Sequence, residues 1–215
     1  MTSLDEALRG SGLGLEVDAD AEARITRFLE LRAQWARTHN LAGPRALTAP
    51  WRIDVIDGLA VGEIMAPSLP LVDVGAGGGV PGLVVATLYP ARPVILVEPR
   101  AKRAAFLRTA VYTLELSEAR VIRARWPLES ALGPHQVVSR AVVSPAQWPS
   151  LALEGGSEVL GIIRMLAADR PGLRGQGLEL RRAVDYTSAE GDRRVEYWAR
   201  VGDITSASEA ADAGE

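Results

Sequence analysis

A glycine-dense loop between a strand-like and a helix-like segment constrains the fold of this chain more than any other feature. The loop lies in LVDVGAGGGVPG, residues 71–82, where Asp73 stands near the end of an apolar run. Glycines follow at alternate positions, Gly75, Gly77 and Gly79. Residues 69–74 have the short apolar pattern of a buried parallel strand, and residues 83–88 resume helical spacing. Because glycine tolerates positive φ and lets backbone approach a ligand, this order predicts a nucleotide-cofactor loop.

The spacing of the loop distinguishes two kinds of cofactor. A dinucleotide loop reads GxGxxG, with an acid about 20 residues further on, whereas this loop reads DxGxGxG. It resembles the S-adenosylmethionine (AdoMet) loop of class I methyltransferases, in which the acid, here Asp73, faces the amino end of methionine. The next apolar run ends in Glu98, where both cofactor classes place an acid for ribose hydroxyls. Glu98 thus indicates a nucleoside without identifying it, and a tight glycine turn that binds nothing is the alternative.

Composition and periodicity predict one α/β domain with an extension. The 215 residues, 47% of them hydrophobic, suffice for one large core. We expect a helical N-terminal extension over residues 1–66, an AdoMet-binding domain over 67–203 and a disordered tail over 204–215. Helical spacing covers residues 19–40, 51–64, 81–90, 100–115 and 145–153.

Strand patterns alternate with helical ones after residue 67. They cover residues 69–74, 93–98, 120–124, 136–140, 158–164, 178–187 and 193–201. This alternation predicts a Rossmann-like, mostly parallel sheet of seven strands that ends in an antiparallel hairpin. That is the layout of the class I AdoMet-dependent methyltransferases. Ligands then collect at the carboxyl ends of the strands.

The composition excludes several kinds of site. The chain has no cysteine and only two histidines, so we expect no disulfide and no metal centre. No apolar run is long enough to span a bilayer and the N-terminus lacks the pattern of a signal peptide, so we expect a cytoplasmic protein without a membrane partner.

Basic residues concentrate in one segment although the net charge is −3. Residues 92–125 carry eight Lys and Arg residues against three glutamates. This segment is either a phosphate-binding surface or an ordinary solvated helix face. As phosphate contacts of an RNA substrate we select Lys102, Arg103 and Arg123.

Several motifs together resemble one family. They are WARTHNL (35–41), DVIDGL (54–59), DVGAGGGVPG (73–82), EPRAKRAAFLRTAVYTLEL (98–116), VVSRAV (137–142) and GDRRVEYWAR (191–200). The family is that of the bacterial small-subunit ribosomal RNA guanine-N7 methyltransferases (RsmG/GidB), and the likeness covers residues 35–201. It implies AdoMet contacts at Gly75, Gly77 and Val80, a ribose contact at Glu98 and a site arginine at Arg140.

Arg140 is the main candidate for a catalytic role. It follows the fourth strand, so it stands at the same edge of the sheet as Asp73 and should face the crevice. A salt bridge to Asp73 or Glu98 is the alternative. Arg164, at the end of the fifth strand, is the second candidate. We expect the cofactor site to comprise Asp73, Gly75, Gly77, Gly79, Val80, Glu98, Trp126 and Arg140.

The chain departs from the family pattern at several positions. Asp54 replaces the family's histidine, and Arg164 stands where the family has a lysine. Trp126 either stacks on adenine or fills the pocket. The other departures are Ala36, Ala42 and Pro127. These changes concern the expected substrate contacts more than the cofactor contacts.

The implied reaction requires no general base. Guanine N7 carries a free lone pair, so the enzyme need only align donor and acceptor. Arg140 or Arg164 could hold a phosphate or the O6 and N7 edge of guanine. We expect a monomer that acts on ribosomal RNA or the small ribosomal subunit. The alternatives are a small-molecule AdoMet methyltransferase, a non-catalytic AdoMet-binding protein and an NAD-type enzyme. An open basic crevice would favour the RNA enzyme and a lidded apolar pocket the small-molecule enzyme. A pocket plugged by Trp126 would favour the non-catalytic protein.

Overall fold

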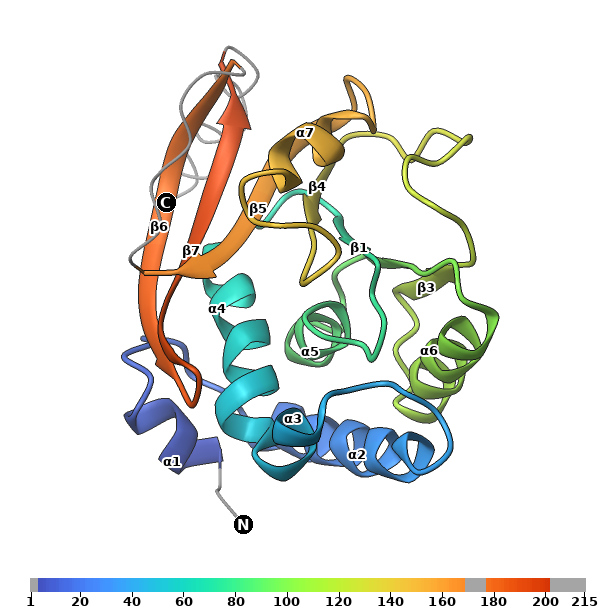
Figure 1. Ribbon diagram of the computed structural model, residues 1–215, viewed down its shortest axis with the longest axis vertical. Coiled ribbons are helices and arrows are strands. Elements are labelled where there is room, and N and C mark those ends of the chain that lie inside the picture. Colours follow the sequence, from blue (N-terminus) through green and yellow to red (C-terminus); the bar gives the residue numbers. More distant parts are fainter. Residues whose placement is uncertain (1–3, 169–176, 202–215) are drawn as a thin grey trace, which may run out of the picture.

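The computed structural model describes residues 4–168 and 177–201, so the predicted tail over 204–215 lies outside the described residues. A seven-stranded sheet forms the centre of the molecule, with the order β3-β2-β1-β4-β5-β7-β6 (Figure 1). The strands are β1 (Leu71–Val74), β2 (Val94–Val97), β3 (Ala119–Ile122), β4 (His135–Val138), β5 (Val159–Ala167), β6 (Leu178–Ser188) and β7 (Gly191–Arg200). Strands β1 to β5 run parallel, and the β6–β7 hairpin adds to β5 in antiparallel orientation. The predicted class I methyltransferase sheet is confirmed.

The helices lie close to the predicted positions. They are α1 (Leu4–Arg9), α2 (Ala19–Ala36), α3 (Pro44–Thr48), α4 (Ile56–Ile64), α5 (Gly82–Leu88), α6 (Ala101–Thr113) and α7 (Trp148–Leu153). Asp18 begins α2 because its carboxylate accepts the Ala21 N–H at 2.7 Å. The segment predicted as one helix over 51–64 instead starts with a π-helical turn, η1 (Trp51–Val55), which precedes α4. This turn carries Asp54, which is buried.

Two apolar layers cover the sheet, because alternate residues of each strand point to opposite faces. Leu71 and Leu96 pack with α2, α4, α5 and α6 on one face, and Val72 and Ile95 pack with α7 on the other (Figure 1). The N-terminal helices belong to the first of these layers, in which Phe28 of α2 is fully buried. They therefore share one core with the sheet. In the described part of the chain, no helix has the length and apolar character needed to cross a bilayer.

Candidate active site

A cavity of about 630 Å³ lies at the carboxyl ends of β1, β2 and β4. Most of the predicted cofactor residues line it: Gly75, Gly77, Val80, Glu98, Trp126 and Arg140. Asp73 and Gly79 do not line it, and neither do Lys102, Arg123 and Arg164. The structure thus brings together the glycine loop, the acid after β2 and the arginine after β4.

The glycine loop leaves open space at Gly77. Its φ is +54°, and a Cβ placed there would meet only the Gly75 carbonyl at 3.5 Å and the Arg103 guanidinium at 3.6 Å. The cavity lies above this backbone. A Cβ at Gly82, by contrast, would lie 2.4 Å from Leu96 and 2.7 Å from the Asp73 carboxylate. Gly77 therefore leaves room for a ligand, whereas Gly82 permits close packing of α5 on the sheet.

Glu98 connects two loops at the cavity. One carboxylate oxygen accepts the Gly77 N–H at 3.0 Å and the other accepts the Arg100 N–H at 2.8 Å. The side chain is 2% exposed. Because each oxygen retains a second lone pair, Glu98 can still accept hydrogen bonds from the hydroxyls of a nucleoside.

Asp73 lies beneath the glycine loop. Its Oδ2 accepts the Gly82 N–H at 2.9 Å, at the first residue of α5. Its Oδ1 is buried and has no hydrogen-bond partner among the described residues. Burial raises the pKa of Asp73 to about 7, against the opposing effect of the Gly82 hydrogen bond. The predicted contact with a ligand gains no support from this position, whereas a role in holding α5 does.

Trp126 forms one wall of the cavity without filling it. Its indole N–H donates to the Leu151 carbonyl at 2.9 Å, and its ring packs edge-on against His135 and closely over Gly155. The cavity is open, so the expectation that Trp126 fills the pocket does not match the structure. Stacking on a ligand base remains a prediction.

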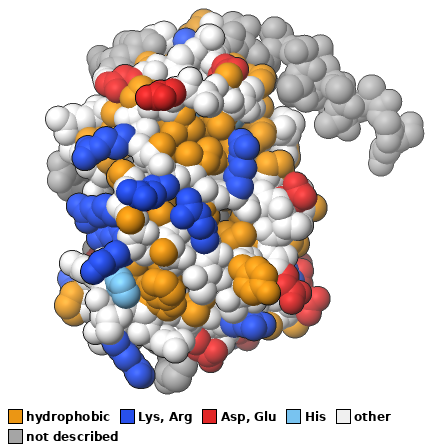
Figure 2. Space-filling model, turned by 90° about the vertical axis from the view of Figure 1, so that its right-hand side faces the viewer, with side chains coloured by type: hydrophobic (Ala, Val, Ile, Leu, Met, Phe, Trp, Pro, Cys, Tyr) orange, Lys and Arg blue, Asp and Glu red, His pale blue; other side chains and the backbone are white. Residues whose placement is uncertain are grey.

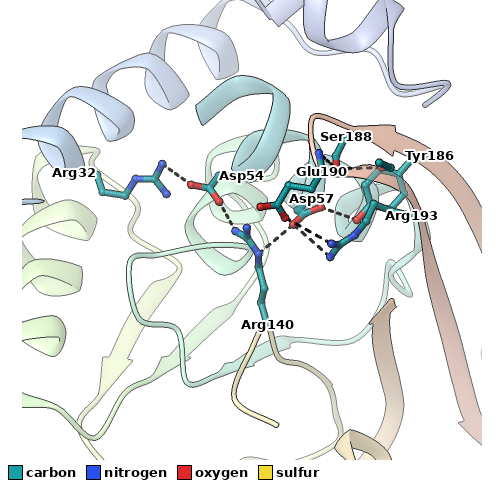
Figure 3. A network of polar contacts seen from close by, with 9 residues as sticks. Arg32, Asp54, Asp57, Arg140, Tyr186, Ser188, Glu190 and Arg193 are labelled. Carbon is teal, nitrogen blue, oxygen red and sulfur yellow. Dashed lines mark hydrogen bonds and ion pairs between the residues drawn. The ribbon is translucent and has the colours of Figure 1, made fainter. Parts of the chain in front are cut away.

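Arg140 lies at the cavity and belongs to a buried ionic network (Figure 3). Its Nη1 contacts Asp54 and its Nε lies 3.0 Å from Asp57. The expected alternative partners, Asp73 and Glu98, are not the ones it binds. Burial acts to lower the pKa of Arg140, but the Asp57 and Asp54 carboxylates raise it overall. The guanidinium is therefore firmly cationic, and both of its partners come from the N-terminal helical region.

The same network extends to the terminal hairpin. Asp57 accepts the Tyr186 hydroxyl at 2.7 Å and lies 4.0 Å from Arg193. Burial raises the pKa of Asp57, although Arg140, Arg193 and Tyr186 all oppose this shift. On the other side, Asp54 pairs with Arg32 of α2.

Arg164, the second predicted catalytic residue, lies away from the cavity. Its guanidinium is buried, with Nη1 3.2 Å from Glu196 and Nε donating to the Pro145 carbonyl at 2.8 Å. The sequence predicted a strand that ends at residue 164, but β5 continues to Ala167, so Arg164 lies within the strand and its side chain joins β5 to β7. A catalytic role for Arg164 gains no support from this position.

The predicted RNA-contacting residues lie on the α6 side of the molecule. Lys and Arg side chains gather on this face, as Figure 2 shows from the side of α6 and β3 in Figure 1. Arg103 lines the cavity and donates to the Asn40 carbonyl at 2.9 Å, so it also holds the loop after α2. Lys102 and Arg123 are both exposed and lie outside the cavity lining.

Sequence reasoning missed part of the lining. The additional residues are Arg32, Leu41, Ala42, Gly43, Arg100, Arg125, Ala141 and Val142, among others. Arg100 and Arg125 follow strand ends, a signal that could have identified them. Leu41 had no such signal, since its carbonyl lies over Gly78 only because the loop after α2 crosses the glycine loop.

Comparisons with known proteins agree on one family. Residues 21–159, more than half of the chain, match the family model described as rRNA small subunit methyltransferase G, GidB. The ribosomal RNA small subunit methyltransferase G of Nitrosospira multiformis is 38% identical over 141 residues, 65% of this chain and 65% of that protein. The protein of the same name from Dichelobacter nodosus is 33% identical over 61% of this chain and 63% of its own length. The match thus spans slightly less than two thirds of these two relatives.

Two solved structures have a similar fold with a TM-score above 0.5. A protein from Klebsiella pneumoniae assigned as an O-methyltransferase has a TM-score of 0.55 at 13% identity, over 87% of this chain and 92% of that one. TrmN from Thermus thermophilus has a TM-score of 0.51 at 20% identity, over 68% of this chain and 49% of that one. At these identities the likeness concerns the fold alone.

Proposed function

Because this chain belongs to the rRNA small subunit methyltransferase G (GidB) family, we propose that it is an AdoMet-dependent enzyme that methylates guanine N7 in small-subunit ribosomal RNA. The observation that carries the proposal is the open cavity in which the glycine loop, Glu98 and Arg140 meet. We also propose that the enzyme is a monomer. With ribosomal RNA as the substrate, we also propose a cytoplasmic location.

The residues around the cavity fit AdoMet. A Cβ at Gly77 would meet no atom closer than 3.5 Å, and Glu98 offers carboxylate lone pairs at the end of β2. A cavity of about 630 Å³ is within the usual size range for small-ligand sites. We assign Gly75, Gly77 and Val80 to the cofactor backbone contacts and Glu98 to the ribose hydroxyls. Bound AdoMet supplies a methyl group on a positively charged sulfur.

The acceptor side needs positioning more than acid–base chemistry. Guanine N7 has a free lone pair, so the residues of the chain have no proton to remove from it. Arg140 can donate to a phosphate or to the O6 of the base, which fixes the base in line with the donor. The described residues contain no cluster of metal-ligating side chains, and this reaction does not require one.

The charge around the cavity supports an RNA substrate over a small apolar one. Five arginines line it, Arg32, Arg100, Arg103, Arg125 and Arg140, against the acids Asp54 and Glu98. Asp54 is already paired with Arg32 and Arg140, so Arg100, Arg103 and Arg125 leave an excess of positive charge for phosphates. The net charge of −3 favours the second candidate, a small-molecule methyltransferase.

The test is methyl transfer from labelled AdoMet to small ribosomal subunits and to naked ribosomal RNA, both taken from a strain that lacks the gene. We expect incorporation at a single guanine and recovery of N7-methylguanine by mass analysis. Subunits from the parent strain serve as the control, because their site is already methylated. AdoMet binding by calorimetry without methylation of either RNA substrate would contradict the proposal and favour a small-molecule or non-catalytic protein.

A further inference from the structure

Asp54 stands where the family pattern has a histidine, and the structure gives it two cationic partners. It is 2% exposed, in the π-helical turn before α4. Its Oδ2 lies 2.6 Å from Nη2 of Arg32, and its Oδ1 accepts a hydrogen bond from Nη1 of Arg140. Three segments far apart in the sequence thus meet at one carboxylate (Figure 3).

Asp57 completes the contacts of the Arg140 guanidinium. Its Oδ2 lies 3.0 Å from Nε of Arg140, one helical turn after Asp54. The two carboxylates therefore contact two of the three guanidinium nitrogens, Nε and Nη1. The structure shows no hydrogen bond from the other terminal nitrogen, Nη2, to residues 4–168 or 177–201, and Arg140, which is 22% exposed, lines the cavity. This leaves one donor group of Arg140 for a ligand.

We propose that Asp54 is a positioning residue that, together with Asp57, fixes Arg140 so that its remaining donor faces the RNA base to be methylated. The inference rests on the proposed function. An arginine side chain is flexible, and a fork held by two carboxylates is ordered before the substrate arrives. The same carboxylates balance the charge of Arg140, so that the guanidinium does not repel a positively charged sulfur or a methylated purine.

A histidine at position 54 would not provide the same contacts. A neutral imidazole has one acceptor nitrogen and a protonated one has none, whereas a carboxylate has two acceptor oxygens. Only the carboxylate can pair with Arg32 and accept from Arg140 together. The Arg32–Asp54 pair therefore gives this chain its own way of holding the arginine at the cavity.

The experiment is a double-mutant cycle on Asp54 and Arg140 with small-subunit methylation as the assay. Asp54→Asn keeps the shape of the side chain and removes its charge. We expect kcat to fall about tenfold while the dissociation constant of AdoMet changes by less than about twofold. In the Arg140→Ala background, Asp54→Asn should cause no further loss, because Asp54 acts through Arg140. Equal losses in both backgrounds would overturn the proposal.

A matched control separates positioning from stability. Glu196 also belongs to a buried arginine–carboxylate pair, but it lies outside the cavity lining. Glu196→Gln should therefore lower the melting temperature and leave kcat unchanged. If Asp54→Asn does not fold because Arg32 loses its partner, Arg32→Gln with Asp54→Asn removes both charges of the pair. This double variant should show the same loss of kcat, and full activity would overturn the proposal.

A second measurement needs neither AdoMet nor turnover. In the wild-type protein the Nε–H of Arg140 should give a sharp nitrogen–proton NMR signal with slow exchange, because Asp57 and Asp54 hold it. Asp54→Asn should broaden this signal or speed its exchange. An unchanged signal, or unchanged kcat in an active protein, would refute the positioning role of Asp54. A wild-type protein that methylates no RNA would refute the proposed function, while the NMR result would still show whether Asp54 holds Arg140.

Discussion

Asp73 should make the free protein less stable at alkaline pH, and Asp73→Asn should remove this effect. The side chain is 0% exposed, and burial raises its pKa from an ordinary 3.8 to about 7. A carboxyl group with a higher pKa in the folded state binds its proton more tightly there. Its contribution to stability is therefore complete below pH 3.8 and is lost as the pH rises through 7.

The size of the effect follows from the two pKa values. At pH 5 the carboxyl group of Asp73 favours the protonated form about 100-fold in the folded protein, whereas it is mostly ionised in the unfolded chain. At pH 8 both states are ionised. Between these pH values the wild-type protein should lose about 2.5 kcal/mol through Asp73, at about 1.4 kcal/mol for each pKa unit. Asparagine does not titrate, so the Asp73→Asn variant should not show this loss of stability.

The assay is thermal unfolding of both proteins at pH 5 and pH 8 without ligand. For a chain of this length, the melting temperature of the variant relative to the wild type should rise by about 5–10 °C between the two pH values. All other titrating groups are common to both proteins and cancel in the comparison. The same difference at both pH values would mean that Asp73 is ionised throughout, and would refute the argument from burial.

Further measurements test other parts of the site. Gly77→Ala should weaken AdoMet binding at least tenfold, or about 1.4 kcal/mol. The control is Gly12→Ala: Gly12 also has a positive φ, and a Cβ added there has no atom within 4 Å, so this change should carry similar strain and leave binding intact. Equal affinities in calorimetry would count against the cavity as the cofactor site. Arg164→Met should destabilise the protein by about 2 kcal/mol, because the buried Glu196 loses one of its two arginine partners and keeps Arg194. A loss of kcat that exceeds the loss of folded protein would restore the catalytic prediction. Replacing Lys102 and Arg123 with glutamine should flatten the salt dependence of RNA binding by about 0.7 in log–log slope for each lost phosphate contact, and an unchanged slope would exclude them from the interface.

The sequence predicted those parts of the fold that depend on local patterns. The strand, glycine loop and helix around Asp73 follow from apolar spacing and glycine positions within about 20 residues, and the sheet follows from the alternation of such units. The same local logic identified Glu98 and the hairpin. Such features need no knowledge of which distant segments meet.

The partners of Arg140 could not be predicted in this way. Its contact with Asp54 joins residues 86 positions apart, and it exists because the π-helical turn before α4 brings Asp54 to the lining of the cavity. Strand position alone left Asp73 and Glu98 as the expected partners. For Arg164 the predicted strand end was wrong, because β5 continues to Ala167 where it pairs with β7, and this pairing places Arg164 opposite Glu196.

The two hydrogen bonds of Glu98 bear on any redesign of this cavity. Its oxygens accept the amides of Gly77 and Arg100, so the loops after β1 and β2 are joined before a nucleoside enters. Replacing Glu98 to change the cofactor preference would free both amides and loosen two loops together. A successful redesign must therefore supply new acceptors for those amides as well as new contacts for the ligand.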